Sequence, residues 1–476
     1  ALPLIALQYH EVRINLEFNT LNNLCWDYSN TSDPHAVRNR VGQCGLAAAS
    51  LYVDYIYLDT DERRKFAQVS HEYLIDVLQF TGGESITSSA NKLKLNFNHP
   101  CKELVWVVQR DSFVSCDDAV INPWKAPMFT SAFDFLPDGR AVISTFHGDV
   151  FIASGIDEKL EKVTWRRFAS GLYHALGLKV VNGEIYVTCR DGLWKLRDTN
   201  GDGECDTYEA FNFDLMVTKN FHEFTFDLQT DPAGNFYVIK AGPVRKGGRG
   251  FDEICDHHGA LLKISPDGKK SELFASGFRA PNGIGISPTG QLTSGDNEGT
   301  WTPMCRLNWI KQGGFYGVSP LAHRATEPTD YDRPLCWFPK EVDNSSGGQV
   351  WVTSDKFGPW KDRLLHLSYG TCSMYGVLPQ EVSFNGQPQM QGGVARFNVD
   401  FASGAMRARF NPQDGQLYVT GLRGWQTTAT QNGCFQRVRY TGAATRMPLA
   451  LAATKKGIKL DFTCEIDAKV AADAGN

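Results

Sequence analysis

Short runs in which apolar and polar residues alternate recur along most of the chain, and they predict an all-β protein. Residues 4–18 form the first such run, and similar runs cover 50–58 and 92–97. The apolar positions of the first run are Val12, Ile14, Leu16 and Phe18. Between these runs, acidic and then basic residues follow Asp59, which suits the N-cap of a short helix. We expect that helix to present only a solvated face.

One hairpin pattern returns six times from residue 129 onward: an alternating strand, a turn rich in Gly, Asp or Asn, and a second apolar strand. The six copies cover residues 132–145, 175–188, 224–240, 283–294, 349–353 and 406–421. This repetition predicts a six-bladed β-propeller. The alternative, a β-sandwich, seldom repeats one hairpin pattern so often, and closing a ring protects most strand edges.

These patterns divide the chain into four parts. Residues 1–123 form a β-rich segment, 124–128 a junction, 129–447 the propeller, and 448–476 the first strands of a further β-sandwich or a tail. The chain begins with Ala and has no cationic leader, so it looks like a fragment or a processed product.

Composition narrows the classes of partner. The 476 residues carry 48 basic and 53 acidic side chains, a net charge of -5, so we expect no nucleic acid as partner. No apolar run reaches the ~18 residues of a membrane span. The 12 cysteines are scattered without a Cys-x-x-Cys pair, which argues against a zinc site or a haem attachment.

A loop after the fourth strand of the array has the ligand spacing of an EF-hand. Its side-chain ligands would be Asp198, Asn200, Asp202, Asp206 and Glu209, with Glu204 contributing its backbone carbonyl. Hard oxygen ligands at this spacing, with Gly203 allowing the sharp turn, predict Ca²⁺ in a structural role. The alternative is an acidic, solvated turn.

His222 stands immediately before the first strand of the third hairpin. An imidazole at this position can be aimed into the central channel and is the usual general base. The alternative is a structural histidine bonded to a backbone carbonyl.

Two groups of residues are candidates for binding a charged ligand, one group for a cation and the other for an anion. Asp296, Asn297 and Glu298 offer oxygens for a cation, while Arg279 and its neighbour Asn282 offer donors for a carboxylate. The remaining candidate ligands for an anionic cofactor, with a tryptophan as a stacking plane, are Arg407, Arg409, Arg423 and Trp425. The alternative is a set of ordinary turn residues and surface arginines.

The motifs "LPLIALQYHEV", "LYVDYIYLDTDERRKFAQVSHEYLI", "LQFTGGE" and "LNFNHPCKELVWVVQ" resemble the major capsid protein of large DNA viruses of algae and protists over residues 1–123. That family folds as a double jelly roll and assembles as trimers. The resemblance therefore implies a partial jelly-roll β-segment before the propeller and a possible homotrimer.

The later motifs, among them "NFHEFTFDLQTDPAGNFYV", "GFRAPNGIGISPTGQLTSGDNEGTW" and "MRARFNPQDGQLYVTGLRGWQ", resemble the propeller of soluble quinoprotein sugar dehydrogenases and of planctomycete-type membrane-bound dehydrogenases over residues 127–447. The resemblance implies oxidation of a sugar or polyol by hydride transfer to pyrroloquinoline quinone, with His222 as the base. It also implies that Asn282 matches the Asn of the family's R-N-P-x-G motif and that Arg407 and Arg409 contact the quinone.

Two departures from that family affect the cofactor and the acceptor. Asp296-Asn297-Glu298 replaces the Gly-Pro whose carbonyls hold the quinone's Ca²⁺, and no Cys-x-x-Cys-His follows, so the electron acceptor would be external.

Three functions follow as alternatives: a quinoprotein-type dehydrogenase, a non-catalytic calcium-stabilised binding propeller, and a structural viral capsid protein. The first places the chain in the periplasm or outside the cell, and the third places it in the virion. The chain also looks like a chimera of two truncated families, whether natural, engineered or misjoined.

Overall fold

The computed structural model describes residues 58–68, 95, 97, 100, 102, 104, 122–124, 126–248, 250–424 and 426–467. The chain divides into two units, residues 1–109 and 110–476, and each is described by itself. Apart from a few single positions, the strands predicted over 4–18, 50–58 and 92–97 lie outside the described residues.

The first unit contains the predicted helix, α3 (Thr60–Gln68). The Asp59 carboxylate accepts hydrogen bonds from the amides of Asp61 and Glu62 at 2.9 and 2.8 Å, and Glu62 accepts one from the Asp59 amide at 3.1 Å. This reciprocal pair is a capping box, which satisfies amides that the first helical turn leaves free. The helix with Asp59 at its N-cap is confirmed, and none of its residues is buried.

The described part of the second unit is almost entirely β, as the sequence predicts. The first sheet contains β1 (Thr130–Phe135), β2 (Ala141–Thr145), β3 (Val150–Ser154) and β4 (Thr164–Ala169). The second contains β5 (Gly177–Val181), β6 (Glu184–Thr188), β7 (Leu193–Arg197) and β8 (Thr207–Asn212). The third contains β9 (Thr225–Thr230), β10 (Phe236–Lys240), β11 (Ala260–Ile264), β12 (Ser271–Ser276) and β16 (Gly314–Phe315).

Three further sheets follow in chain order. The fourth contains β13 (Ile284–Ile286), β14 (Leu292–Asp296), β15 (Cys305–Ile310) and β17 (Cys336–Phe338). The fifth contains β18 (Ser346–Trp351), β19 (Leu364–Ser368), β20 (Ser373–Phe384) and β21 (Gln387–Asp400). The sixth contains β22 (Gly404–Phe410), β23 (Leu417–Leu422) and β24 (Gly433–Val438). Two 3₁₀ helices, η3 (Ser319–Leu321) and η4 (Asp355–Trp360), lie in connections.

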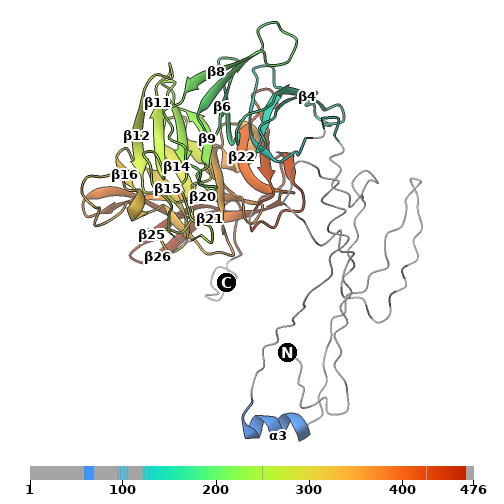
Figure 1. The fold of residues 1–476 in the computed structure, drawn as a ribbon. Coiled ribbons are helices and arrows are strands. Elements are labelled where there is room, and N and C mark those ends of the chain that lie inside the picture. The colour runs from blue at the N-terminus through green and yellow to red at the C-terminus, as the bar shows by residue number, and fades with distance from the viewer. Residues whose placement is uncertain are drawn as a thin grey trace, which may run out of the picture. The chain divides into compact units, whose positions relative to one another are not determined.

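The six sheets are arranged in a ring (Figure 1). The first strand of each sheet contacts the first strand of the next, in the order β1, β5, β9, β13, β18 and β22, and β22 contacts β1 again. The strands at the centre are more buried than those at the outside: every residue of β1 is buried, whereas β4 and β8 are largely exposed. Burial on both faces explains why the inner strands are short and rich in apolar and small residues.

Five of the six predicted hairpins form antiparallel pairs that begin sheets. The remaining copy, predicted only as a strand from residue 349 onward, overlaps β18, which begins at Ser346 and pairs with β19. The turn between β1 and β2 shows the local cause, because Gly139 adopts a φ of 87° there. Side chains rarely adopt this conformation, so glycine favours the turn.

Residues 448–462 contain a two-stranded hairpin that contacts the fifth sheet. Strands β25 (Pro448–Thr454) and β26 (Gly457–Phe462) pair with each other, and β25 contacts β20. Gln380 on β20 accepts a hydrogen bond from the Ala453 amide at 2.8 Å and donates one to the Ala453 carbonyl at 3.2 Å.

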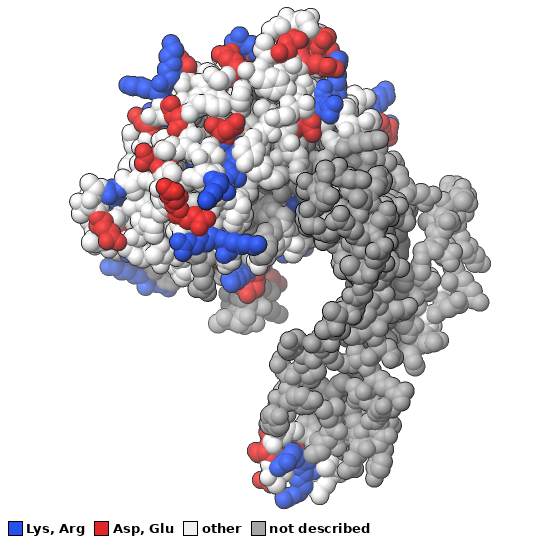
Figure 2. All heavy atoms as spheres, in the orientation of Figure 1, with Lys and Arg blue, Asp and Glu red and all other residues white. Residues whose placement is uncertain are grey.

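Surface and covalent features add three facts. Acidic and basic side chains are interspersed on the face of the ring seen in Figure 2. In the part of the chain that the structure describes, no helix is long and apolar enough to span a bilayer. The eight described cysteines are free thiols.

Candidate functional site

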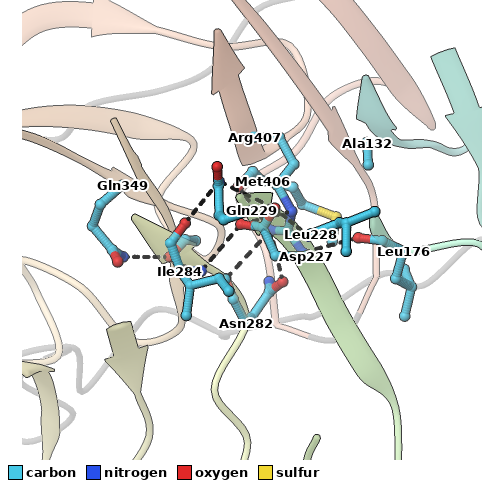
Figure 3. Close-up of polar contacts among 12 residues, drawn as sticks. Ala132, Leu176, Asp227, Leu228, Gln229, Asn282, Ile284, Gln349, Met406 and Arg407 are labelled. Carbon is cyan, nitrogen blue, oxygen red and sulfur yellow. Dashed lines mark hydrogen bonds and ion pairs between the residues drawn. The ribbon is translucent and has the colours of Figure 1, made fainter. Parts of the chain in front are cut away.

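The centre of the ring holds a buried carboxylate, Asp227, beside Arg407 (Figure 3), and a second arginine pairs with the same carboxylate. Asp227, on β9, has an oxygen 3.4 Å from Nε of Arg407 and another 3.3 Å from Nη2 of Arg409. It also accepts hydrogen bonds from the amides of Leu228 at 2.8 Å and Ile284 at 3.1 Å. Asp227 adopts a φ of 56°, which is uncommon for a residue with a side chain. The contacts made by its carboxylate hold it in this conformation.

Arg407 joins four sheets at one guanidinium. Its Nη1 donates to the Asn282 side-chain oxygen at 3.2 Å, and its Nη2 donates to the Leu176 carbonyl at 3.1 Å. Burial lowers the pKa of Arg407 from its usual value, and the Asp227 charge opposes that effect. The structure thus brings together Asn282, Arg407 and Arg409, three of the predicted cofactor ligands. Arg407 is fully buried and Arg409 nearly so, so a ligand carboxylate would have to displace Asp227 to reach them.

His222 lies at the end of the ring where the first strands begin. Its amide donates to the Asn220 side chain at 2.7 Å, and its ring lies between Phe221 and Phe224. Burial, and then the charge of the nearby Arg279, lower the pKa of His222 to about 4, while a backbone hydrogen bond with Gly242 opposes both effects. The imidazole is therefore neutral at pH 7, and its buried Nδ1 has no hydrogen-bond partner.

A second histidine that the sequence analysis missed has the same properties. His174 precedes β5, stacks on Phe146 with ring centres 4.4 Å apart, and lies 5.6 Å from Phe224. Burial, then the charges of Arg190 and His147, lower the pKa of His174 to about 4. Its Nδ1 is also buried without a partner. Its position just before the first strand of its sheet, which matches that of His222, is the signal that could have identified it.

These residues define a histidine face at one end of the ring. It consists of Phe146, His147, Tyr173, His174, Phe221, His222 and Phe224. Tyr173 is 47% exposed and Phe221 is 54% exposed, so this face offers aromatic surface to solvent next to two neutral imidazoles.

Glu223 anchors the loop that carries His222. Its carboxylate lies 2.5 Å from Nε2 of His258, accepts from the Thr218 amide at 2.6 Å and pairs with Arg190 at 3.2 Å. The Cys255 amide donates to Nδ1 of His258 at 3.0 Å, so the ring proton of neutral His258 sits on Nε2 and is donated to Glu223. Burial alone would raise the pKa of Glu223, but the His258 and Thr218 hydrogen bonds and the Lys240 charge lower it to about 2.

The predicted calcium loop forms a compact turn between β7 and β8. Asp198 accepts from the Gly201 and Gly203 amides at 2.7 and 2.8 Å, and Asp206 accepts from the Asn200 side chain at 3.0 Å. The Asp202 carboxylate lies in the same turn and accepts from the Glu204 amide at 2.8 Å.

Of the predicted side-chain ligands, Glu209 turns its carboxylate away from the loop, and so does Glu204, from which only the backbone carbonyl was predicted to bind. Glu209 lies on β8 and pairs with Arg197 at 3.4 Å, and Glu204 pairs with Arg166 at 3.3 Å. Among the described residues, no group of three or more His, Cys, Asp and Glu side chains is placed to hold a metal ion. Any Ca²⁺ here would rely on the Asn200 amide and on backbone carbonyls beside the aspartates.

The second predicted cation site is filled by the protein itself. Asp296 is fully buried, and Nη2 of Arg306 donates to it at 2.7 Å. Nη1 of Arg306 donates to the Asn297 carbonyl at 2.5 Å, while Glu298 is exposed. These residues do not fit the Ca²⁺ of a quinone site, because a guanidinium stands where the cation would be.

The remaining predicted ligands do not form one cluster. Arg279 donates to the Gly248 carbonyl at 2.7 Å and influences His222, whereas Arg423 is exposed and Trp425 lies outside the described residues. In register with R-N-P-x-G, the residue after Arg279 is Ala280, so Asn282 falls on the variable position.

The N-terminal region of the chain matches two known protein-family models. Residues 1–59 match the family described as "Major capsid protein N-terminus", and residues 62–148 match "Large eukaryotic DNA virus major capsid protein". The chain is 53% identical over 153 residues to a major capsid protein of Chrysochromulina ericina virus, covering 29% of this chain and 26% of that protein. It is 63% identical over 107 residues to that of Pyramimonas orientalis virus, covering 22% and 23%.

The chain thus spans about a quarter of the length of these capsid relatives. The predicted capsid resemblance is confirmed, and the family match extends past residue 123 to residue 148, through β1 and β2.

The ring is similar to solved structures of another kind. A putative glucose dehydrogenase from Thermus thermophilus is 18% identical with a TM-score of 0.48, covering 65% of this chain and 96% of that one. An aldose sugar dehydrogenase from Streptomyces coelicolor, in its PQQ-bound form, is 12% identical with a TM-score of 0.48, covering 66% and 95%.

Proposed function

We propose that residues 129–447 form a six-bladed β-propeller that oxidises a sugar or polyol, with His222 as the base that accepts the hydroxyl proton. The observation that carries this proposal is the histidine face, where His222 is neutral at pH 7 and its Nδ1 is unpaired. A general base must be unprotonated and able to accept a hydrogen bond from the substrate, so the buried Nδ1 would have to become accessible when the sugar binds.

The other residues of the face suit the same substrate class. Tyr173 and Phe221 present exposed rings on which the C–H surface of a sugar can stack, leaving its hydroxyls toward His222 and His174. Phe146 and Phe224 pack against the imidazole of His174 and keep water from part of that side chain. The oxidation removes a proton, which His222 takes, and a hydride, which an external two-electron acceptor must take.

Pyrroloquinoline quinone does not fit the residues predicted to hold it. Arg407 and Arg409 are paired with Asp227, and the site of its Ca²⁺ contains Arg306. No step is therefore assigned to the quinone. A structural Ca²⁺ between β7 and β8, held by Asp198, Asn200, Asp202 and Asp206, is a separate part of the proposal.

The test is dye reduction by the full chain with a panel of sugars and polyols, with and without the quinone. We expect one of these substrates to drive reduction and His222→Ala to lower the rate by about 100-fold or more. Because the pKa of His222 is about 4, kcat/KM should fall only below about pH 5.

Lys459→Ala, an exposed change on β26, is the control and should keep the wild-type rate. If no substrate reduces the dye under either condition, the ring is better explained as a calcium-stabilised platform for carbohydrate or protein.

A second function is favoured by the capsid match of residues 1–148. We propose that this region can associate as a trimer of the capsid type, which would place the chain in the virion. The dehydrogenase proposal by itself implies a periplasmic or secreted protein.

A further inference from the structure

We propose that Arg306 is a built-in replacement for the cation at the β14–β15 end of the fourth sheet, so that Asp296, Asn297 and Glu298 bind no Ca²⁺. This inference does not depend on the proposed oxidation, because it concerns only how the charge of Asp296 is balanced.

The carboxylate of Asp296 has no acceptor site left for a metal. One oxygen accepts from the amides of Ala280 at 2.9 Å and Asn297 at 2.8 Å. The other accepts from the Arg279 amide at 3.0 Å and from Nη2 of Arg306 at 2.7 Å. A carboxylate offers about four lone-pair sites, and all of them are used.

Arg306 also takes the other oxygens of this loop. Its Nη1 donates to the Asn297 carbonyl at 2.5 Å and to the Thr302 hydroxyl at 3.1 Å, and its Nη2 donates to the Tyr316 carbonyl at 2.8 Å. Ca²⁺ needs about six to eight oxygens, and the predicted ligands leave only two groups available: the exposed Glu298 carboxylate and the Asn297 side-chain oxygen, which the Cys305 thiol contacts at 3.8 Å.

The strand register explains why this replacement is permanent. Asp296 at the end of β14 lies directly opposite Arg306 near the start of β15. Arg306 is 1% exposed and Asp296 is fully buried, so separating them would leave two buried charges without partners. Removing one partner of a buried ion pair is strongly destabilising, and among the described residues the exposed Glu298 carboxylate makes no contact that would compensate for the loss.

The experiment isolates this loop from the β7–β8 loop. In the full chain carrying Asp198→Asn and Asp202→Asn, Ca²⁺ is titrated calorimetrically and Tb³⁺ luminescence is recorded with tryptophan excitation, because Trp301 lies in the loop between Asp296 and Arg306. We expect no heat of binding when Ca²⁺ is added to millimolar concentration. We also expect no Tb³⁺ luminescence on tryptophan excitation. A signal that disappears in Trp301→Phe would overturn the proposal.

Changes at Arg306 in the same background test the replacement directly. Arg306→Met frees the oxygens, so a folded variant should gain a Tb³⁺ site, whereas Arg306→Lys keeps a positive charge and should not. A folded Arg306→Met chain that gains no site would also contradict the proposal. If Arg306→Met does not fold, the titration of the background chain decides alone. Neither measurement uses sugar oxidation, so the outcome for Arg306 does not depend on whether the proposed function is correct.

Discussion

At the scale of single residues, the buried charges of the ring are balanced by partners that lie far away in the sequence. Glu223 is paired with Arg190 and His258, and Asp227 with two arginines of β22. A buried charge is costly unless it is paired and hydrogen-bonded, so these partners are part of the fold. The strongest effects of substitution should occur where one member of such a group is removed.

Glu223→Gln is the sharpest change at this scale. Glutamine keeps the shape but leaves the buried Arg190 and Lys240 without a counter-charge, so we expect the free energy of unfolding to fall by about 3 kcal/mol in urea titrations.

The pH dependence of stability provides a second readout of that change. The folded pKa of Glu223, about 2, is below the unfolded value of about 4.3, so its contribution is present above pH 4.3 and is lost as pH falls toward 2. In the Glu223→Gln variant, the free energy of unfolding should not show this decrease at acid pH. Glu381→Gln, an exposed change on β20, should behave as wild type. Equal stability of both variants would show that Glu223 does not anchor the loop.

At the scale of elements, the inner strands are tied together from the centre of the ring. The contacts of Arg407 reach β9, the start of β5 and the segment just before β13 (Figure 3). Because these strands come from separate sheets, this cluster couples sheets that share no strand-to-strand hydrogen bonds.

Asp227→Asn should therefore loosen several strands at once. The amide keeps the side-chain shape but leaves Arg407 and Arg409 without their shared counter-charge, which we expect to cost about 3–5 kcal/mol. Hydrogen exchange should accelerate in β5, β9, β13 and β22 together. Asp355→Asn is the control, since its carboxylate is 90% exposed and pairs only with Lys361. Faster exchange confined to β9 would contradict coupling through this cluster.

At the scale of the whole molecule, the stretch that matches the capsid family overlaps the start of the ring. The capsid-family match ends at residue 148, whereas the ring begins with β1 at Thr130. The first hairpin of the ring thus also satisfies the capsid pattern. Alternating strands joined by tight turns are common to jelly rolls and propellers, so a local pattern does not separate the two folds here.

The oligomeric state tests the contribution of the capsid-like region. If residues 1–148 associate as in capsid proteins, light scattering coupled to gel filtration should give three times the monomer mass of 52.9 kDa for the full chain. A chain beginning at residue 127 keeps the closed ring and should be monomeric. A monomeric full chain would exclude capsid-type assembly. If the chain that begins at residue 127 is itself trimeric, the ring mediates the association and the capsid-like region is not needed for it.

The local features of this protein can be predicted from its sequence alone. The helix capped by Asp59, five of the six hairpins and the turn at Gly139 follow from residues within a few positions of each other, so their patterns predict them correctly. The position of His222 before β9 was also readable, because it follows from the hairpin that begins there.

Only the tertiary structure decided what the charged residues do. Asp227 and Arg407 are 180 positions apart, and they meet because the ring places β9 and β22 near one centre. Arg306 reaches Asp296 through strand register, and Glu209 turns to Arg197 because β8 pairs with β7. Sequence spacing carries ligand patterns, but partners are chosen by which strands become neighbours, and buried charges accept the nearest opposite charge.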